Sequence, residues 1–173
     1  MKKRVRRVLK KGKLVSTRTG NVVIHLANKI IKELKPYCSR IQIAGSIRRK
    51  EKNPVDIDIV LIPKNKSGKQ KIQEIMRKKE KARFIQGGEK ESVFRIKGVK
   101  VELYYTNNQE WGACLLAYSS KTGSSIGLRM VAKRKGFKLN QHGLFKNNKR
   151  IAGRTEEEIY HTLGRPWKSP ERR

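Results

Sequence analysis

The sequence predicts an α+β fold, because segments with the periodicity of strands are interspersed with segments that have the periodicity of helices. Residues 55–59 and 99–103 alternate apolar and polar side chains, as half-buried strands do, within expected strands at residues 55–63 and 99–105. Residues 21–34 and 69–81 repeat apolar side chains every three or four positions, as amphipathic helices do. At 173 residues, 36% hydrophobic and 34% charged, the chain can form one ordinary domain or two small packed subdomains.

Residues 1–18 form a basic leader in which Val and Leu are interspersed among Lys and Arg. An ordered strand or helix and a disordered basic arm are both open for this segment, and either could follow a phosphate backbone. The helix at residues 21–34 comes next and ends before Pro36. Its expected apolar stripe consists of Val22, Val23, Leu26, Ile30 and Leu34.

The central region is expected to contain strands and one helix. A short strand at residues 41–44 and a longer one at 55–63 lie on either side of a Gly-Ser segment. The helix at residues 69–81 turns Ile72, Ile75 and Met76 inward. Further strands are expected at residues 84–86, 92–97 and 99–105, the last two joined as a hairpin.

The C-terminal third is expected to form a smaller α/β unit. Asn108 caps a first helix, and a turn rich in Ser and Gly, residues 119–125, separates it from a second helix. A small hairpin at residues 139–151 turns at Asn147 and Asn148. Residues 155–158 are a capping box, Thr-Glu-Glu-Glu, that opens a last short helix. The expected apolar positions of the second helix are Ile126, Leu128, Met130, Val131 and Ala132.

The charge of the chain is extreme, with 44 Lys and Arg against 14 Asp and Glu, a formal net charge of +30. Such a field attracts polyanions and opposes compaction, so nucleic acid is the leading partner. An anionic membrane is a weaker candidate, because the sequence has no long apolar run and no lipidation motif. A merely soluble, highly charged surface is the alternative that requires no partner.

The two cysteines, Cys38 and Cys114, have no paired spacing, and no signal peptide precedes them. We therefore expect buried free thiols in an intracellular protein that is not secreted. The three histidines form no zinc-like cluster with the cysteines, so zinc is not indicated.

The segment that suggests chemistry is Gly45-Ser46-Ile47-Arg48-Arg49, with Asp56 and Asp58 beginning eleven positions after its glycine. Because successive strand side chains point to opposite faces, the two aspartates emerge side by side on one face. Paired carboxylates suit Mg²⁺, the glycine allows close approach to a phosphate, and the arginines can neutralise its charge. Together these features indicate metal-assisted nucleotidyl transfer. Alone, an Asp-x-Asp pair is more simply a solvated strand face.

Glu102 is a third candidate ligand. It is the acidic residue on the polar face of the strand at residues 99–105, between Lys100 and Tyr104. From the residues alone, an ordinary surface charge is the simpler interpretation of this side chain.

The spacing of these motifs resembles that of the nucleotidyltransferase superfamily, and most closely of the family X DNA polymerases, whose palm carries Gly-Ser-x-Arg-Arg followed by Asp-x-Asp. The resemblance extends to residues 136–145 and 155–164, which look like that family's thumb. It implies a mixed-sheet palm with flanking helices at residues 19–106 and a thumb-like α/β subdomain at 107–173, after the leader at 1–18. It also implies the minimal form without the amino-terminal lyase domain, as in the smallest viral members.

The resemblance also assigns roles to individual residues. Two Mg²⁺ ions, for which Mn²⁺ can substitute, would be held by Asp56, Asp58 and Glu102. Glu102 would bind the ion that lowers the pKa of the primer 3′ hydroxyl. The incoming nucleotide would be bound by Gly45, Ser46, Arg49, Tyr118 and Ser125, with Arg48 nearby. Nucleic acid would be bound by Arg129, Lys133 and Lys138.

The sequence departs from the family pattern in two places. The family has aspartate where this chain has Glu102, and the extra methylene moves the carboxylate by about an ångström, a misplacement that can cost about 10²-fold in rate. The family's Tyr-Phe-Thr-Gly-Ser segment matches residues 117–121 without a gap, while a literal Thr-Gly-Ser occurs at residues 122–124. Both alignments remain open, and the second moves the roles of Tyr118, Ser125 and Arg129. Ala117 replaces an aromatic residue near the sugar, which affects discrimination against ribonucleotides.

The resulting prediction is a monomeric, DNA-directed DNA polymerase of repair or gap-filling type that uses a dNTP and gapped or primer–template DNA. It would act in the cytoplasm or inside a virus-infected host cell, without membrane association. A nucleotidyltransferase that works without a template, or on an RNA or small acceptor, is one alternative. A basic nucleic-acid-binding protein with a weakened active site is the other, and the hint for it is Glu102.

Overall fold

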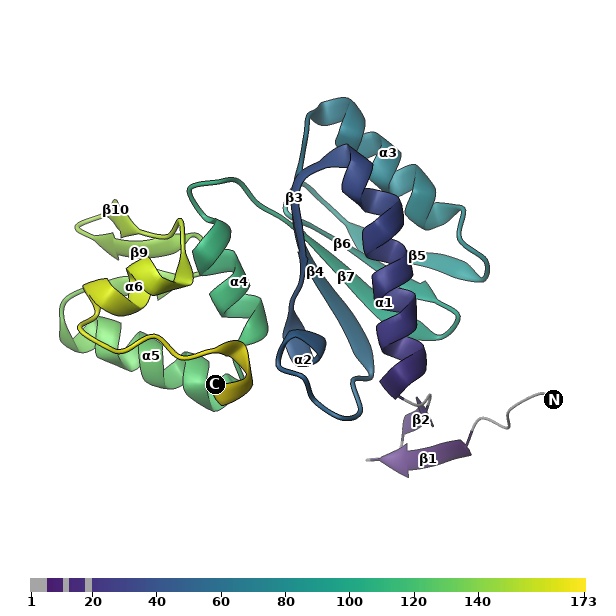
Figure 1. The fold of residues 1–173 in the computed structure, drawn as a ribbon, viewed down its shortest axis with the longest axis horizontal. Coiled ribbons are helices and arrows are strands. Elements are labelled where there is room, and N and C mark those ends of the chain that lie inside the picture. Colours follow the sequence, from purple (N-terminus) through teal and green to yellow (C-terminus); the bar gives the residue numbers. More distant parts are fainter. Residues whose placement is uncertain (1–5, 11–12, 18–19) are drawn as a thin grey trace.

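The computed structural model describes residues 6–10, 13–17 and 20–173. Figure 1 shows two parts, a larger one built on a five-stranded sheet and a smaller C-terminal one of helices and short strands. The α+β fold is therefore confirmed. Before the larger part, β1 (Arg6–Lys10) and β2 (Lys13–Thr17) pair as an antiparallel hairpin within the basic leader.

The larger part is a mixed sheet with the strand order β3-β4-β7-β6-β5. Its strands are β3 (Cys38–Ile43), β4 (Asp56–Pro63), β5 (Ala82–Gly87), β6 (Glu91–Ile96) and β7 (Val99–Tyr105). The central pair, β4 and β7, is parallel, and the other neighbours are antiparallel. The crossover from β4 to β7 places two strands that are distant in the chain side by side at the middle of the sheet.

Two helices cover one face of this sheet, α1 (Gly20–Leu34) and α3 (Lys66–Arg77), as Figure 1 shows. The core between them and the sheet contains fully buried Ile30, Ile57 and Phe94. One expected contact of α1 is wrong, because Val22 is 45% exposed and Ala27 is buried in its place. The stripe of α1 follows positions 23, 27, 30 and 34, which is one face of a 3.6-residue helix.

The smaller part contains helices α4 (Trp111–Ser119), α5 (Thr122–Arg134) and α6 (Glu156–Thr162). A three-stranded antiparallel sheet lies between α5 and α6 in the chain, formed by β8 (Lys138–Asn140), β9 (Gly143–Lys146) and β10 (Lys149–Ala152). The turn between β9 and β10 is at the expected residues, since Asn147 and Asn148 both have positive φ angles. Leu144 and Ile159 are fully buried in the core of this part.

Three expectations for the smaller part need correction. The Asn107 carboxamide, and not Asn108, accepts hydrogen bonds from the backbone N–H groups before α4, at 2.9 and 3.1 Å. Most of the Ser- and Gly-rich segment lies inside α5, whose first turn is closed by a hydrogen bond from the Ser125 backbone N–H to the Lys121 carbonyl at 2.9 Å. Ile126 and Met130 are 51% and 50% exposed, so they are not core positions.

A separate apolar cluster joins the two parts on the other face of the sheet. Val60 and Tyr104 of the central strands pack against Trp111, Cys114 and Leu115 of α4. Both cysteines are buried free thiols, as expected, and burial raises the pKa of Cys38 to about 11 and that of Cys114 to about 12. Within the described ranges, no helix combines the length and apolar character needed to cross a membrane.

Candidate metal and nucleotide site

The three candidate carboxylates lie on one face of the central strands. In the parallel pairing of β4 with β7, Asp58 stands opposite Glu102 and Asp56 stands opposite Lys100. Paired residues of adjacent strands project to the same face, and so do residues two apart in one strand. The fold therefore gathers Asp56, Asp58 and Glu102, with Lys100 among them, beside the cluster formed with α4.

The surroundings of Asp58 strongly change the pKa of its carboxyl group. Burial, followed by repulsion from the carboxylates of Asp56 and Glu102, raises the pKa of Asp58 from 3.8 to about 7. The Tyr104 hydroxyl lies 3.4 Å from Asp58 Oδ1 and donates to it. Burial and the same anionic neighbours raise the pKa of Tyr104, so its hydroxyl keeps the proton that it donates. A buried carboxylate that repels its neighbours is stabilised by any cation placed among them.

Lys100 supplies one such cation. Its Nζ atom lies 2.8 Å from Glu102 Oε2, while the Glu102 side chain is only 16% exposed. As the side chains stand, no three His, Cys, Asp or Glu residues in the described part of the chain are placed to hold a metal ion. The donor set nevertheless fits a hard divalent cation, because it offers carboxylate oxygens on one face with too little positive charge to balance Asp58. A side-chain rotation of Glu102 away from Lys100 would free the third carboxylate.

A tight turn packs directly against these carboxylates. Gly45 begins the one-turn helix α2 (Gly45–Arg48) at φ +59°, and a Cβ atom added to it would collide with the Asp58 carboxylate. Glycine is required here both for the backbone angle and for the space. The neighbouring Ser46 Oγ is buried and has no hydrogen-bond partner among the described residues. An orphan buried hydroxyl beside a glycine turn fits an anionic ligand such as a phosphate.

The two arginines after this turn bind the smaller part of the protein. Arg49 Nη1 donates to the Ser119 carbonyl at 3.0 Å, and its Nε atom donates to Glu51 at 3.0 Å. Arg48 forms a two-pronged ion pair with Glu156 of α6, at 2.7 and 2.8 Å, and also donates to Ser119 Oγ at 3.0 Å. Arg49 would have to exchange these bonds to bind a triphosphate, as the family resemblance implies.

Glu156 is the centre of a contact that sequence analysis missed. Arg173 donates to the same carboxylate as Arg48, at 2.6 and 3.1 Å, so one buried anion joins two arginines. Burial opposes ionisation of Glu156, but the hydrogen bonds from both arginines outweigh it and its pKa lies below the usual value. No sequence signal separates Glu156 from the neighbouring Glu157, which is exposed. Lys100 and Tyr104 could have been suspected, since each lies two positions from Glu102 in a strand.

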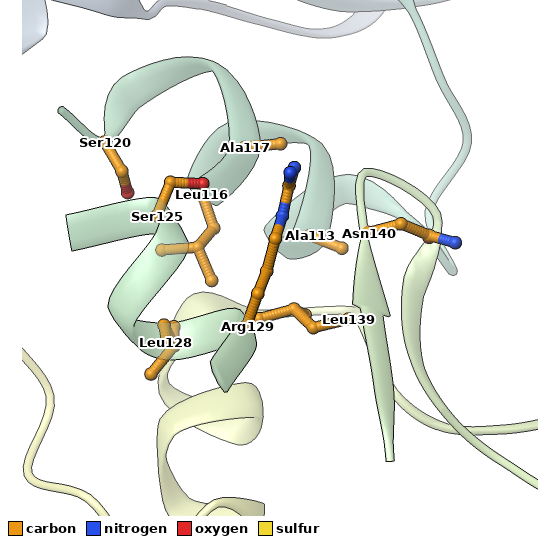
Figure 2. Close-up of a pocket in the computed structure, with 9 residues that line it drawn as sticks. All are labelled: Ala113, Leu116, Ala117, Ser120, Ser125, Leu128, Arg129, Leu139 and Asn140. Carbon is orange, nitrogen blue, oxygen red and sulfur yellow. The ribbon is translucent and has the colours of Figure 1, made fainter. Parts of the chain in front are cut away.

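The remaining expected nucleotide-binding residues lie at the junction of α4 and α5. The Tyr118 ring stacks on that of Tyr104, with ring centroids 3.5 Å apart and planes inclined by 14°. Ser125 and Arg129 line one small pocket together with Ala117, and Figure 2 shows the Arg129 side chain extending from α5 toward Ala117. Lys133 and Lys138 are both exposed nearby.

Comparison with known proteins supports the resemblance found in the sequence. Residues 114–173 match the family model described as the DNA polymerase beta thumb. The Repair DNA polymerase X of African swine fever virus (isolate Warthog/Namibia/Wart80/1980) is 28% identical over 168 residues, which cover 93% of this chain and 95% of the relative. Together these matches support the resemblance to the family X DNA polymerases that the motifs indicate.

Two further relatives are also named as DNA polymerases. The Repair DNA polymerase X of the Badajoz 1971 Vero-adapted strain of the same virus is 28% identical over 164 residues, or 88% of this chain and 94% of the relative. The DNA polymerase IV of Saccharomyces cerevisiae is 32% identical over 74 residues, which are 43% of this chain and 13% of that protein. The family X thumb match begins at Cys114, so it includes most of α4 and all later elements.

Proposed function

We propose that this chain is a repair-type DNA polymerase that transfers a nucleotide from a dNTP to the 3′ hydroxyl of a DNA primer. The names of its relatives support DNA synthesis in repair. The observation that carries the proposal is the pairing of Asp58 with Glu102 across the central strands, with Asp56 on the same face. A half-buried cluster of like charges beside a glycine turn is poorly suited to a purely structural role.

Mg²⁺ is the proposed metal, in a site for two ions held by Asp56, Asp58 and Glu102. When bound, the ions would activate the primer hydroxyl and neutralise charge on the reacting phosphate. The chain's own residues would position the substrates around them. The Gly45 turn would admit the triphosphate to within hydrogen-bonding distance of the backbone, and the Ser46 hydroxyl would donate to one of its oxygens. Arg49 would then balance charge on the leaving pyrophosphate.

The junction between the two parts would form the rest of the binding surface. We propose a palm at residues 19–106 and a thumb-like subdomain at 107–173, with the basic leader 1–18 ahead of them. Tyr118 would support the nucleotide sugar and Ser125 would contact the base. The DNA strands would be bound by Arg129, Lys133 and Lys138.

The net charge of +30 supports binding to DNA phosphates without sequence preference. If about six phosphates are neutralised, affinity should fall by at least about 10³-fold between 50 and 200 mM salt. We also propose that the protein acts inside the cell as a monomer, where reducing conditions keep Cys38 and Cys114 as thiols.

Extension of a labelled primer on a one-nucleotide gap, with each dNTP and each rNTP in turn, tests the proposal. Wild-type protein should add one nucleotide in the presence of Mg²⁺, and Asp56→Ala should not, while both bind the gapped DNA equally. Glu89→Ala is the matched control, because Glu89 is exposed on a turn at the far end of β5. Unchanged extension by Asp56→Ala would refute the proposed metal site.

The ion pair between Lys100 and Glu102 favours a second candidate function, a DNA-binding protein whose active site is weakened. In that case the wild-type protein would bind gapped DNA but would not extend the primer with either Mg²⁺ or Mn²⁺. Lys100→Ala would not restore extension either. Addition to a single-stranded primer at the same rate as to the gap would instead indicate transfer without a template.

A further inference from the structure

A second pocket lies in the smaller part of the protein, on another side of α5 from Arg129. It measures about 480 Å³, which is within the range of small-molecule sites. Leu128 lines both this pocket and the one that contains Ser125 and Arg129, so the two pockets are neighbours on α5. In Figure 1 the segment after α6 runs beside α5, and this segment forms the outer wall of the pocket.

The walls of this pocket are fixed by the fold. The helix contributes Ser124, Gly127, Leu128 and Val131, whose spacing places them on one face of α5. Arg173 holds the opposite wall, because its Nε atom donates to the Lys168 carbonyl at 2.7 Å and its guanidinium is bound to Glu156. The pocket therefore exists before any ligand arrives, which lowers the cost of binding.

The lining combines an apolar floor with two cations. Leu128, Val131 and Pro166 are apolar, and the buried ring of Tyr160 completes the floor. Arg165 and Lys168 are exposed, and none of the described residues that line the pocket is acidic. Arg173 is already neutralised by Glu156, so Arg165 and Lys168 supply the positive charge that a ligand would meet. This chemistry suits a flat apolar group that carries a phosphate.

We propose that this pocket binds one unpaired nucleotide of a DNA strand, with the base against the apolar floor and its phosphate on Arg165 and Lys168. Single strands bind proteins through such combinations of basic groups and flat apolar surfaces, with little dependence on sequence. The proximity to Arg129 favours a nucleotide of a strand that already contacts α5 over a free nucleotide. The inference goes beyond the proposed activity, because it concerns binding and requires no nucleotide transfer.

Trp167 can report occupancy of the pocket, because it lies in the chain between Pro166 and Lys168, which both line it. It is 43% exposed, beside Pro166 and Lys168, whereas the other tryptophan, Trp111, is 5% exposed in the cluster that joins the two parts. Titration with oligothymidylate of ten residues should quench the fluorescence of Trp167, and Trp167→Phe should remove the change. The titration is performed on the full chain without dNTP or divalent metal, so no extension takes place.

Filling the pocket tests its role. Gly127→Leu places a side chain in the pocket, at a helix position where an added Cβ atom meets nothing within 4 Å. Gly123→Leu is the matched control, because it makes the same change in the same helix, also in open space, but does not line the pocket. We expect Gly127→Leu to weaken oligothymidylate binding about tenfold, as expected for loss of one bound base. Gly123→Leu should weaken it less than about threefold on the same scale. Thermal unfolding should show that both variants remain folded.

The charge contribution is tested separately with Arg165→Ala/Lys168→Ala against Lys66→Ala/Lys71→Ala, which removes the same charge from α3 on the larger part. The pocket pair should lose clearly more affinity than the α3 pair. The proposal would be overturned if the pocket variants and their controls lost the same affinity for oligothymidylate in both comparisons. It would also be overturned if the fluorescence of Trp167 were not quenched. Binding of thymidine monophosphate as tight as that of the oligonucleotide would overturn the assignment to a strand and would identify a free-nucleotide site.

Discussion

Replacing Asp58 with asparagine should stabilise the metal-free protein above neutral pH, although it should abolish nucleotide transfer. The reason is that the folded structure makes the ionised form of this carboxyl unfavourable. Burial and the neighbouring carboxylates of Asp56 and Glu102 raise its pKa from 3.8 to about 7. Asparagine has nearly the same shape, carries no charge and can still accept the hydrogen bond from Tyr104.

The direction and the magnitude of the expected change in stability follow from proton linkage. Between pH 4 and pH 7 the folded state keeps a proton on Asp58 that the unfolded state has released, so the free energy of unfolding falls as pH rises through this window. Above the folded pKa the loss is complete. A shift of about 3 pKa units, at about 1.4 kcal/mol each, corresponds to about 4 kcal/mol as an upper value at pH 8.

Urea unfolding in EDTA at pH 5 and pH 8 measures this effect. The stability of Asp58→Asn relative to wild type should increase by about 2–3 kcal/mol from pH 5 to pH 8. Glu157→Gln, an exposed change on α6, should show no such increase. Mg²⁺ should stabilise the wild type at pH 8 more than Asp58→Asn. If the difference between variant and wild type is the same at both pH values, the carboxylates do not repel one another in the folded state.

Three other substitutions test the surroundings of the site. Glu156→Gln should cost about 3 kcal/mol in urea unfolding, because two arginines lose their shared buried anion; a cost as small as that of Glu157→Gln would contradict this role. Gly45→Ala should lower the unfolding midpoint and abolish primer extension, because its Cβ atom would collide with Asp58 and its φ angle is positive. Wild-type stability and activity of this variant would show that the turn is not tight. Tyr104→Phe removes a hydrogen bond that lowers the pKa of Asp58, so the acid limb of the pH–rate profile should move to higher pH. An acid limb at the same pH as in the wild type would rule out that hydrogen bond.

The strands of the larger part could be predicted because each carries its own local pattern. Asp56 and Asp58 alternate with buried Ile57 and Ile59, which fixes the face of both carboxylates from four residues. The placement of Glu102 opposite Asp58 could not be derived in the same way. It depends on the register of a parallel pair, and the two residues are separated by 44 positions in the chain.

The contacts that join the two parts could not be predicted for a related reason. Arg48 was expected near a phosphate, but the structure places it against Glu156, whose neighbour Glu157 has the same chemistry and remains in solvent. The choice between them is made by the orientation of α6. The Ser- and Gly-rich segment illustrates the opposite error, since local propensity predicted a turn where residues 122–125 form the first turn of α5.

The parallel pairing of β4 with β7 also affects how the protein folds. The pairs β3–β4 and β6–β7 connect segments that are near in the chain, because residues 44–55 join the first pair and residues 97–98 join the second. The parallel pairing of β4 with β7 can form only when the intervening residues 64–98 have formed a loop. Contacts between residues so far apart in the chain form slowly. The acidic face is therefore complete only when this long-range pairing has formed. Changes in the length of α3 should alter the folding rate more than the geometry of the carboxylates.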